Sequence, residues 1–298
     1  MKQYVWFNKK IIDINKANVP ILSHTLHYGD GVFEGIRCYK TINNNAAIFR
    51  LDDHIKRLFK SANYINIKID FSQQEIKQQC LKIVKKNNLK NCYLRPIVFR
   101  NKRIGLDPQG LEANIAIIAI PFDNYFQKEA IKVKISKFIR LHPQSIISEA
   151  KVCGYYINSI LATIDAKKEG YDEAIMLDYK GYIAEGSGEN IFLVKNDKLY
   201  TPKLGSILPG ITRDTVIKIA KDLKIKVIEK NITVNEILNS DEVFFTGTAA
   251  EITPIYQINN KLINKGKIGK ITNIIKYTYH QIITGEINQY HHWLSFVY

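Results

Sequence analysis

The run NIAIIAIPF at residues 114–122 constrains the fold more than any other stretch of this chain. It is apolar at almost every position and closes with a proline, which cannot donate a hydrogen bond within a sheet. Its length and its β-branched residues indicate a strand that is buried on both faces. Such a strand needs other strands beside it and further secondary structure packed over it. The run therefore predicts a protein built of both sheets and helices.

Hydrophobic periodicity divides the rest of the chain into two unequal blocks. In the first block it predicts strands at 4–7, 32–39, 46–49, 92–99 and 114–121, and helices at 51–65 and 72–87. In the second it predicts strands at 132–138, 173–177, 181–184, 190–194, 198–200, 226–229 and 242–245, and helices at 156–168, from about 211 onward and at 269–284. We therefore expect an α+β fold, with a small N-terminal α/β domain at 1–122, a connection at 123–131 and a larger C-terminal domain at 132–298.

The chain of 298 residues carries 43 Lys and Arg against 28 Asp and Glu, a formal net charge of +15. The basic residues are dispersed and match no known nucleic-acid motif, so a basic nucleic-acid-binding protein remains only as an alternative. No apolar run approaches the ~20 residues of a membrane span, and the start MKQYVWFNKK has no apolar signal-peptide core. The four cysteines are scattered, as in proteins whose thiols stay reduced. These features predict a cytoplasmic protein that binds neither membrane nor nucleic acid.

Residues 208–214, LPGITRD, begin a predicted helix in an unusual way. The first N–H groups of a helix have no partner within the helix, and the Pro209-Gly210 pair leaves the backbone there open to close approach. Water, a side chain or an anionic ligand could occupy this helix start. Lysine is the usual cation of this chain, so each of its eight arginines is also a candidate anion clamp.

Three other stretches carry side chains suited to chemistry. Lys151 in SEAKVCGYYIN precedes an apolar, aromatic helix start, and a lysine beside apolar groups can act as a nucleophile. Glu185 in GYIAEGSGENIF ends a short strand, where it could face a cationic ring nitrogen or simply lie exposed in a hairpin connection. In FFTGTAAEITP, small residues at 246–250 follow a buried strand, and their open N–H groups could bind a carboxylate or phosphate or could serve packing alone.

Together these features match the needs of one cofactor. Pyridoxal 5'-phosphate requires a lysine for its aldehyde, an acid for its pyridinium nitrogen and a helix N-terminus for its phosphate. The chain resembles the branched-chain amino-acid aminotransferases of the fold-type IV pyridoxal-phosphate family over nearly its whole length. The resemblance rests on seven stretches in the family's order: LHYGDGVFEGIRCY, FRLDDHIKRL, CYLRPIVF, EAKVCGYY, AEGSGENIF, LPGITRD and FFTGTAAEITP. It implies two α/β domains with the cofactor at the domain interface.

The resemblance also implies a role for each matched residue in cofactor binding. Lys151 would carry the cofactor as an aldimine and would then move a proton at the substrate Cα as a general acid–base group. Glu185 would pair with the pyridinium N1–H, and Tyr156 with the ring hydroxyl. The phosphate would be held by Arg50, by the N–H groups of Ile211 and Thr212 and by the Thr248 hydroxyl.

For the substrate, the resemblance implies an α-carboxylate site at the N–H groups of Thr248 and Ala249, assisted by the Tyr93 hydroxyl. Arg95, two residues further along the same strand, would support this site and receive the distal carboxylate of glutamate. The pocket would be lined by Tyr28, Phe33 and Tyr125. The implied reaction is reversible amino transfer between leucine, isoleucine or valine and 2-oxoglutarate, in branched-chain amino-acid biosynthesis, by a homodimer or larger homo-oligomer without a metal.

Three stretches depart from the family pattern or have no role in it. The loop RNKRIGLDPQG at 100–110 is basic where relatives are acidic or neutral, FIRLHPQSI at 138–146 is atypical, and YHHWLSFVY at 290–298 has no assigned role. The His291-His292 pair has no third ligand nearby, so we expect it to be solvated rather than metal-bound. A D-amino-acid aminotransferase and an aminodeoxychorismate lyase, which share the fold, stay open as alternatives.

Overall fold

The computed structural model describes residues 2–123 and 125–298, which divide into two compact units. The first unit consists of the chain up to Asp123 together with Ala150–Tyr155 and Gln281–Tyr298. The second consists of the residues up to Glu149 that follow the first unit and of Tyr156–His280. Each unit contains its own sheet, so the prediction of an α+β protein with two α/β parts agrees with the observed architecture.

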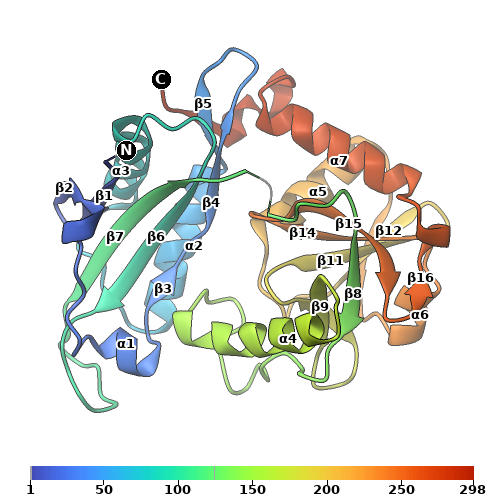
Figure 1. The fold of residues 1–298 in the computed structure, drawn as a ribbon, viewed down its shortest axis with the longest axis horizontal. Helices are drawn as coiled ribbons and strands as arrows, with labels where there is room; N and C mark the ends of the chain where they lie inside the picture. Colours follow the sequence, from blue (N-terminus) through green and yellow to red (C-terminus); the bar gives the residue numbers. More distant parts are fainter. Residues whose placement is uncertain (1, 124) are drawn as a thin grey trace. The chain divides into compact units, whose positions relative to one another are not determined.

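The first unit is an antiparallel sheet with helices packed on it (Figure 1). Its strands run in the order β17-β5-β4-β6-β7-β1-β2, with β3 beside β6. Their bounds are β1 Tyr4–Phe7, β2 Lys10–Asp13, β3 Val32–Phe33, β4 Ile36–Lys40, β5 Ala46–Phe49, β6 Cys92–Arg100, β7 Ala113–Pro121 and β17 Leu294–Phe296. The helices are α1 His24–Tyr28, α2 Leu51–Tyr64 and α3 Gln73–Lys86. The run NIAIIAIPF forms most of β7, between β6 and β1, as predicted. The prediction that both faces are buried holds for only one face, because Ile115, Ile117 and Ala119 are buried whereas Ile118 is half-buried and Ile120 exposed.

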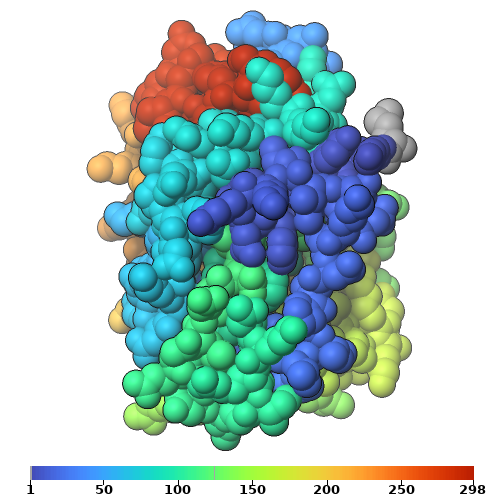
Figure 2. Space-filling model, turned by 90° about the vertical axis from the view of Figure 1, so that its left-hand side faces the viewer, coloured from blue at the N-terminus to red at the C-terminus, as the bar shows by residue number. Residues whose placement is uncertain are grey.

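Local sequence signals account for the two long helices of this unit. Helix α3 begins with a capping box, in which the Ser72 hydroxyl accepts from the Glu75 N–H and the Glu75 carboxylate accepts from the Ser72 N–H. Helix α2 buries Ile55 and Leu58 on one face. Helix α3 packs on β1 and β7, and Figure 2 shows the face of this unit on which α3 (cyan) lies beside the first strands (dark blue).

The second unit is built on a mixed nine-stranded sheet (Figure 1). The strand order is β10-β9-β8-β15-β14-β11-β12-β13, with β16 beside β15. Their bounds are β8 Ile131–Ile135, β9 Glu173–Leu177, β10 Ile183–Gly186, β11 Asn190–Lys195, β12 Lys198–Pro202, β13 Val227–Lys230, β14 Glu242–Gly247, β15 Glu251–Ile258 and β16 Lys261–Leu262. The helices are α4 Tyr156–Lys168, α5 Ile211–Asp222, α6 Val234–Leu238 and α7 Lys270–Ile283. Helix α4 packs on β8 and β9, and α5 packs on β13 and β14.

The observed units differ from the predicted domains in two places. Strand β17 pairs with β5, so the last residues of the chain belong to the first unit rather than to a domain at 132–298. Val152 forms an antiparallel bridge with Val32, which places the segment around Lys151 in the first unit as well. Both segments join the first unit through hydrogen bonds between residues far apart in the sequence, and hydrophobic periodicity cannot predict such bonds. No helix among the described residues is long and apolar enough to cross a membrane.

Candidate functional site

Lys151 lies on a segment whose backbone is fixed at both of its polar groups. Its N–H donates to the Ser61 hydroxyl on α2 over 3.0 Å, and its carbonyl accepts from the Phe33 N–H over 3.2 Å. The Lys151 ammonium lies 4.9 Å from the centroid of the Phe33 ring. An aromatic face both attracts the cation and shields it from water. The first unit therefore holds a half-buried lysine in a defined position beside an apolar surface.

The same Phe33 ring also contacts the residues expected to bind substrate. The Arg95 guanidinium carbon lies 4.5 Å from its centroid, and an Arg95 terminal nitrogen donates to the Tyr93 hydroxyl over 3.1 Å. Tyr93 and Arg95 therefore lie on one face of β6, as their spacing predicts. A Cβ at Gly35 would lie only 1.8 Å from the Tyr93 hydroxyl, so the tyrosine occupies space that only glycine leaves open.

Glu34, the residue that follows Phe33, belongs to a buried ionic cluster. Glu34 accepts from the Arg57 Nε over 2.6 Å and pairs with the His54 Nδ1 over 2.8 Å. Burial alone raises the pKa of Glu34, but Arg57 and His54 outweigh it and hold that pKa well below its usual range. Burial lowers the pKa of His54, and the charge of Lys151 acts in the same direction. The cluster joins β3, which holds the Lys151 segment, to α2.

Arg50 is buried in the first unit, between β5 and α2. Its backbone is in the left-handed region, with φ of 49°. Its Nε donates to Asp53 over 2.6 Å, and its guanidinium carbon lies 5.0 Å from the centroid of the Trp293 ring. An arginine held in one orientation by such contacts is preorganised to bind an anion through its planar, two-pronged guanidinium group.

Glu185 lies inside β10, opposite Met176, and is 6% exposed. One carboxylate oxygen lies 2.9 Å from the Arg140 Nε. The other accepts from the Asn190 side-chain amide over 3.0 Å and from the Leu208 N–H over 3.2 Å. Glu185 is therefore a buried carboxylate held by a cation and by two neutral donors. The alternative of an exposed turn residue is wrong, because the strand runs to Gly186, beyond the predicted end at 184.

Helix α5 begins at Ile211, with Gly210 as a cap residue that makes no side-chain hydrogen bond to the helix. A Cβ at Gly210 would lie 1.9 Å from the Asn190 Oδ1, so glycine is required here for close approach rather than for an unusual φ. Asn190 also donates to the Leu208 carbonyl over 2.9 Å. This asparagine therefore links Glu185 to the segment that leads into α5.

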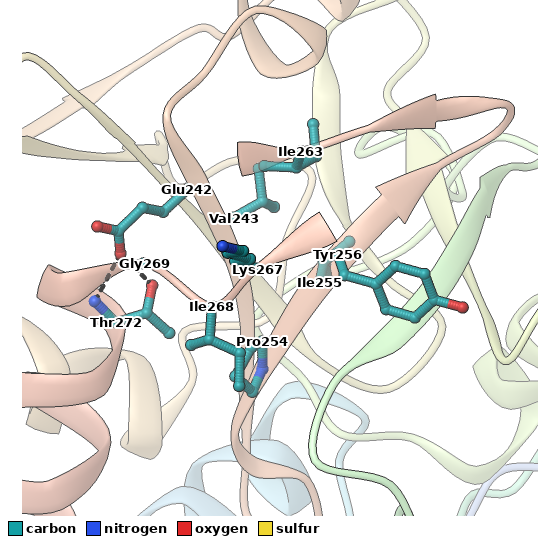
Figure 3. A pocket seen from close by; sticks show the side chains of 10 residues that line it. All are labelled: Glu242, Val243, Pro254, Ile255, Tyr256, Ile263, Lys267, Ile268, Gly269 and Thr272. Atoms are coloured by element: carbon teal, nitrogen blue, oxygen red, sulfur yellow. Dashed lines mark hydrogen bonds between the residues drawn. The ribbon is translucent and has the colours of Figure 1, made fainter. Parts of the chain in front are cut away.

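Helix α7 begins differently, as Figure 3 shows. The Glu242 carboxylate of β14 accepts from the N–H groups of Ile271 and Thr272 over 3.0 and 2.7 Å, and from the Thr272 hydroxyl over 2.6 Å. Glu242 and Thr272, which form this helix cap, are therefore among the residues that line the pocket in Figure 3. The N-cap residue of α5 is Gly210, which has no side chain that could accept from N–H groups in this way, and an anionic ligand at this helix start stays a prediction from the sequence.

The other predicted residues of the second unit lie at the ends of elements. Thr248 and Ala249 form the turn between β14 and β15, and Tyr156 is the first residue of α4. Just before this turn, the Thr246 hydroxyl is buried without a hydrogen-bond partner among the described residues. A buried polar atom without a partner costs free energy, and a bound polar ligand would remove that cost.

The predicted aromatic pocket residues do not all fall in one unit. Tyr28 belongs to the first unit with Phe33, and its hydroxyl accepts from the Gly105 N–H over 3.0 Å. Tyr125 belongs to the second, where its ring packs edge-on against Phe126 at 4.7 Å. The loop at 100–110 is also less basic at its surface than its sequence suggests, because the Arg100 guanidinium is buried against Asp30 at 2.7 Å.

Each unit contains some of the groups that a pyridoxal phosphate site requires. The first unit offers an amine at Lys151 and a buried guanidinium at Arg50. The second offers a buried carboxylate at Glu185 and, at Ile211, a helix start whose N-cap residue is Gly210. The amino-transferase class IV family model matches residues 31–258 of this sequence. The chain belongs to the amino-transferase class IV family.

Individual relatives agree with the predicted family and with its cofactor. The branched-chain-amino-acid aminotransferase of Pseudomonas aeruginosa is 42% identical over 298 residues, covering 98% of this chain and 97% of the relative. The branched-chain aminotransferase of Thermoproteus uzoniensis, solved with norvaline, superposes with a TM-score of 0.97 at 43% identity over the whole of both chains. That of Thermobaculum terrenum, solved in its PLP form, gives a TM-score of 0.95 at 31% identity over 100% of this chain and 99% of its own.

Sequence reasoning missed two residues that hold the Glu185 carboxylate, Arg140 and Asn190. The signal for Arg140 was present, because arginine is rare in this chain and each arginine was a candidate anion clamp. Its partner is a carboxylate of the protein, Glu185, rather than a ligand. Asn190 gave no signal of its own, since only the fold brings β11 against the segment before α5.

Proposed function

We propose that this chain is a pyridoxal 5'-phosphate-dependent branched-chain amino-acid aminotransferase, which moves the amino group reversibly between leucine, isoleucine or valine and 2-oxoglutarate. The observation that carries the proposal is the combination of family membership with a lysine and a buried carboxylate at the matched positions 151 and 185. When bound, the cofactor supplies an electron sink for the substrate Cα.

The protein's own groups would do the rest. Lys151, with its amine beside the Phe33 ring, would bind the cofactor aldehyde and then take and return the proton at the substrate Cα, a step worth typically ~10²–10⁴ in rate. Glu185, fixed by Arg140 and Asn190, would keep the proton on the ring nitrogen. Tyr156 would donate to the ring hydroxyl. The phosphate contacts would come from Arg50, Ile211, Thr212 and Thr248.

Substrate selection would rest on the Phe33 surface. Arg95 and Tyr93 would orient carboxylates, while the Phe33 ring gives an aliphatic side chain an apolar contact. One pocket would thereby accept leucine in one half of the reaction and glutamate in the other. Thr248 and Ala249 would bind the α-carboxylate through their N–H groups, and Tyr28 and Tyr125 would complete the wall.

Borohydride reduction of the protein loaded with cofactor tests this assignment. It should bleach the absorption of the bound cofactor and fix the label to Lys151, as found by peptide mapping. A label on a different lysine overturns the role of Lys151. Leucine, isoleucine and valine should react with 2-oxoglutarate far faster than D-alanine does, and preference for D-alanine or release of pyruvate from aminodeoxychorismate would identify the other two activities of the fold.

We further propose that the enzyme works in the cytoplasm as a homodimer or larger homo-oligomer. The support is the family resemblance, in which a loop equivalent to residues 100–110 closes the pocket of a neighbouring subunit. Sedimentation analysis at several protein concentrations measures the assembly directly. A stable monomer with full activity would contradict this part of the proposal.

A further inference from the structure

The C-terminal stretch YHHWLSFVY has no role in the proposed reaction, yet it contacts the residue proposed to bind the cofactor phosphate. We propose that Trp293 positions the Arg50 guanidinium for that phosphate, so that the end of the chain sets the affinity for the phosphorylated cofactor. This inference rests on the proposed function, in which Arg50 is a phosphate ligand.

The first contact is through the backbone. The Arg50 N–H donates to the Trp293 carbonyl over 2.7 Å. Beyond it, β17 continues as an antiparallel partner of β5, with Leu294 opposite Phe49. The main chain on which Arg50 stands is therefore tied directly to the last strand, and Figure 1 shows the C-terminus beside β5.

The second contact is through the side chains. The Arg50 guanidinium carbon lies 5.0 Å from the centroid of the Trp293 ring, within the range of a cation–π interaction. Asp53 accepts from the Nε over 2.6 Å and fixes the in-plane orientation. A ring on one face and a carboxylate at one edge leave the planar group a single orientation.

The tryptophan is itself held in place. Its ring packs against Tyr290 at 4.6 Å and edge-on against Phe49 at 6.0 Å, and the residue is 9% exposed. The two neighbouring histidines hydrogen-bond to backbone carbonyls in the C-terminal part of the chain. His291 bonds the Gly285 carbonyl over 3.0 Å, and His292 bonds the Gln289 carbonyl over 3.1 Å. The histidine pair thus has a backbone partner for each ring.

The strain in the Arg50 backbone makes this support necessary. Arg50 has φ of 49°, a left-handed conformation that L side chains adopt at a cost. Such a conformation persists when the surrounding contacts fix it. The hydrogen bond to the Trp293 carbonyl and the stacked ring are two such contacts, and both come from the C-terminal segment.

The experiment compares binding of pyridoxal 5'-phosphate and of pyridoxal, which lacks the phosphate, to the full-length apoprotein by equilibrium dialysis. Trp293→Leu should weaken binding of the phosphate ester by about 2- to 30-fold, the range of a cation–π contact, and leave pyridoxal binding unchanged. Trp293→Phe should lose less. Phe296→Leu, which removes from the adjoining strand β17 an aromatic ring that packs against His291, is the matched control and should change the binding of neither ligand.

Arg50→Gln separates the two levels of the argument. If Arg50→Gln leaves the preference for the phosphate ester intact, the proposed phosphate role of Arg50 is wrong. If Arg50→Gln removes that preference while Trp293→Leu preserves it, the positioning role of Trp293 is overturned and the proposed function stands. Equal weakening of both ligands by Trp293→Leu also overturns it, because a general loss of folding does not distinguish the phosphate. Thermal melting of each apoprotein reports such a loss.

Discussion

The Arg140 Nε lies 2.9 Å from the Glu185 carboxylate, and both side chains are almost inaccessible to solvent. A buried carboxylate is costly unless it is paired, and a buried pair is sensitive to the loss of either partner. Arg140 comes from the stretch FIRLHPQSI, which departs from the family pattern at the sequence level. In the structure this stretch contributes the cation that pairs with Glu185, the acid proposed to face the cofactor ring.

Glu185→Gln should leave the cofactor bound but lower kcat by about 10²- to 10³-fold, the cost of removing one preorganised electrostatic group from an active site. The amide keeps the shape and one acceptor for Asn190 and Leu208, but it leaves the buried Arg140 without its counter-ion, so a loss of stability should accompany the loss of kcat. Steady-state kinetics at saturating cofactor, with bound cofactor measured by absorbance, checks this. Arg140→Gln should lower kcat by less, because the carboxylate remains. A Glu185→Gln enzyme with wild-type kcat would remove Glu185 from the mechanism.

Gly35→Ala should raise the KM for the amino acid, because the new Cβ would lie 1.8 Å from the Tyr93 hydroxyl and would displace it from Arg95. Tyr93→Phe deletes the same hydroxyl without a clash and should raise KM about 5- to 10-fold, the value of one hydrogen bond. The double variant should have a KM closer to that of Tyr93→Phe than to the sum of both effects, since Tyr93→Phe removes the hydroxyl that the new Cβ would meet. Additive effects in initial-rate measurements would show that Gly35 acts on something other than Tyr93.

Several of these structural features could be predicted because each depends on residues that are close together in the sequence. The spacing of Tyr93 and Arg95 on a strand, the Ser72 capping box and the glycine at 210 are visible in short windows of sequence. The contacts that fix the Glu185 and Arg50 side chains within their units are not visible in such windows. Glu185 with Arg140, and Arg50 with Trp293, join residues 45 and 243 positions apart in the chain. Only the completed sheets bring such pairs together, and periodicity gives no information about them.

The short elements were missed for a related reason. Helix α1 and strands β2 and β17 have three to five residues each, too few for a period to stand out. They are stabilised by their partners, as β17 is by β5. Missing β17 also led to the domain assignment that placed the whole C-terminus in the second domain.

Protein stability should fall as the pH drops below about 6.5, the ordinary pKa of histidine, and His54→Gln should weaken this dependence. Burial lowers the pKa of His54 in the folded protein, so the unfolded chain takes up a proton that the folded chain refuses. The contribution of His54 is therefore present above the unfolded pKa and is lost as the pH falls. Glu34, Arg57 and Lys151 are the charged groups that act on it. Its partner Glu34, whose pKa is also lowered, adds a loss at more acidic pH.

Urea unfolding of the apoprotein at several pH values between 5 and 8 measures the effect of His54 as a slope. The wild-type slope should exceed that of His54→Gln between pH 5 and 6.5, and the two should converge above pH 7. His27→Gln, at an exposed histidine of the same unit, serves as the control and should keep the wild-type slope. Equal slopes for wild type and His54→Gln would contradict the assignment.

Glu242→Gln should destabilise the protein by about 2–3 kcal/mol, because a charged acceptor of three hydrogen bonds at a helix start becomes a neutral one that also presents two N–H groups to those donors. Thr272→Val, which removes only the hydroxyl bond, should cost about 1 kcal/mol. Chemical denaturation measures both. The kcat of folded Glu242→Gln should match wild type, since this carboxylate caps α7 and none of the proposed cofactor contacts involves it (Figure 3). A selective loss of cofactor binding in Glu242→Gln would instead connect this helix start to the active site and remove the contrast with α5.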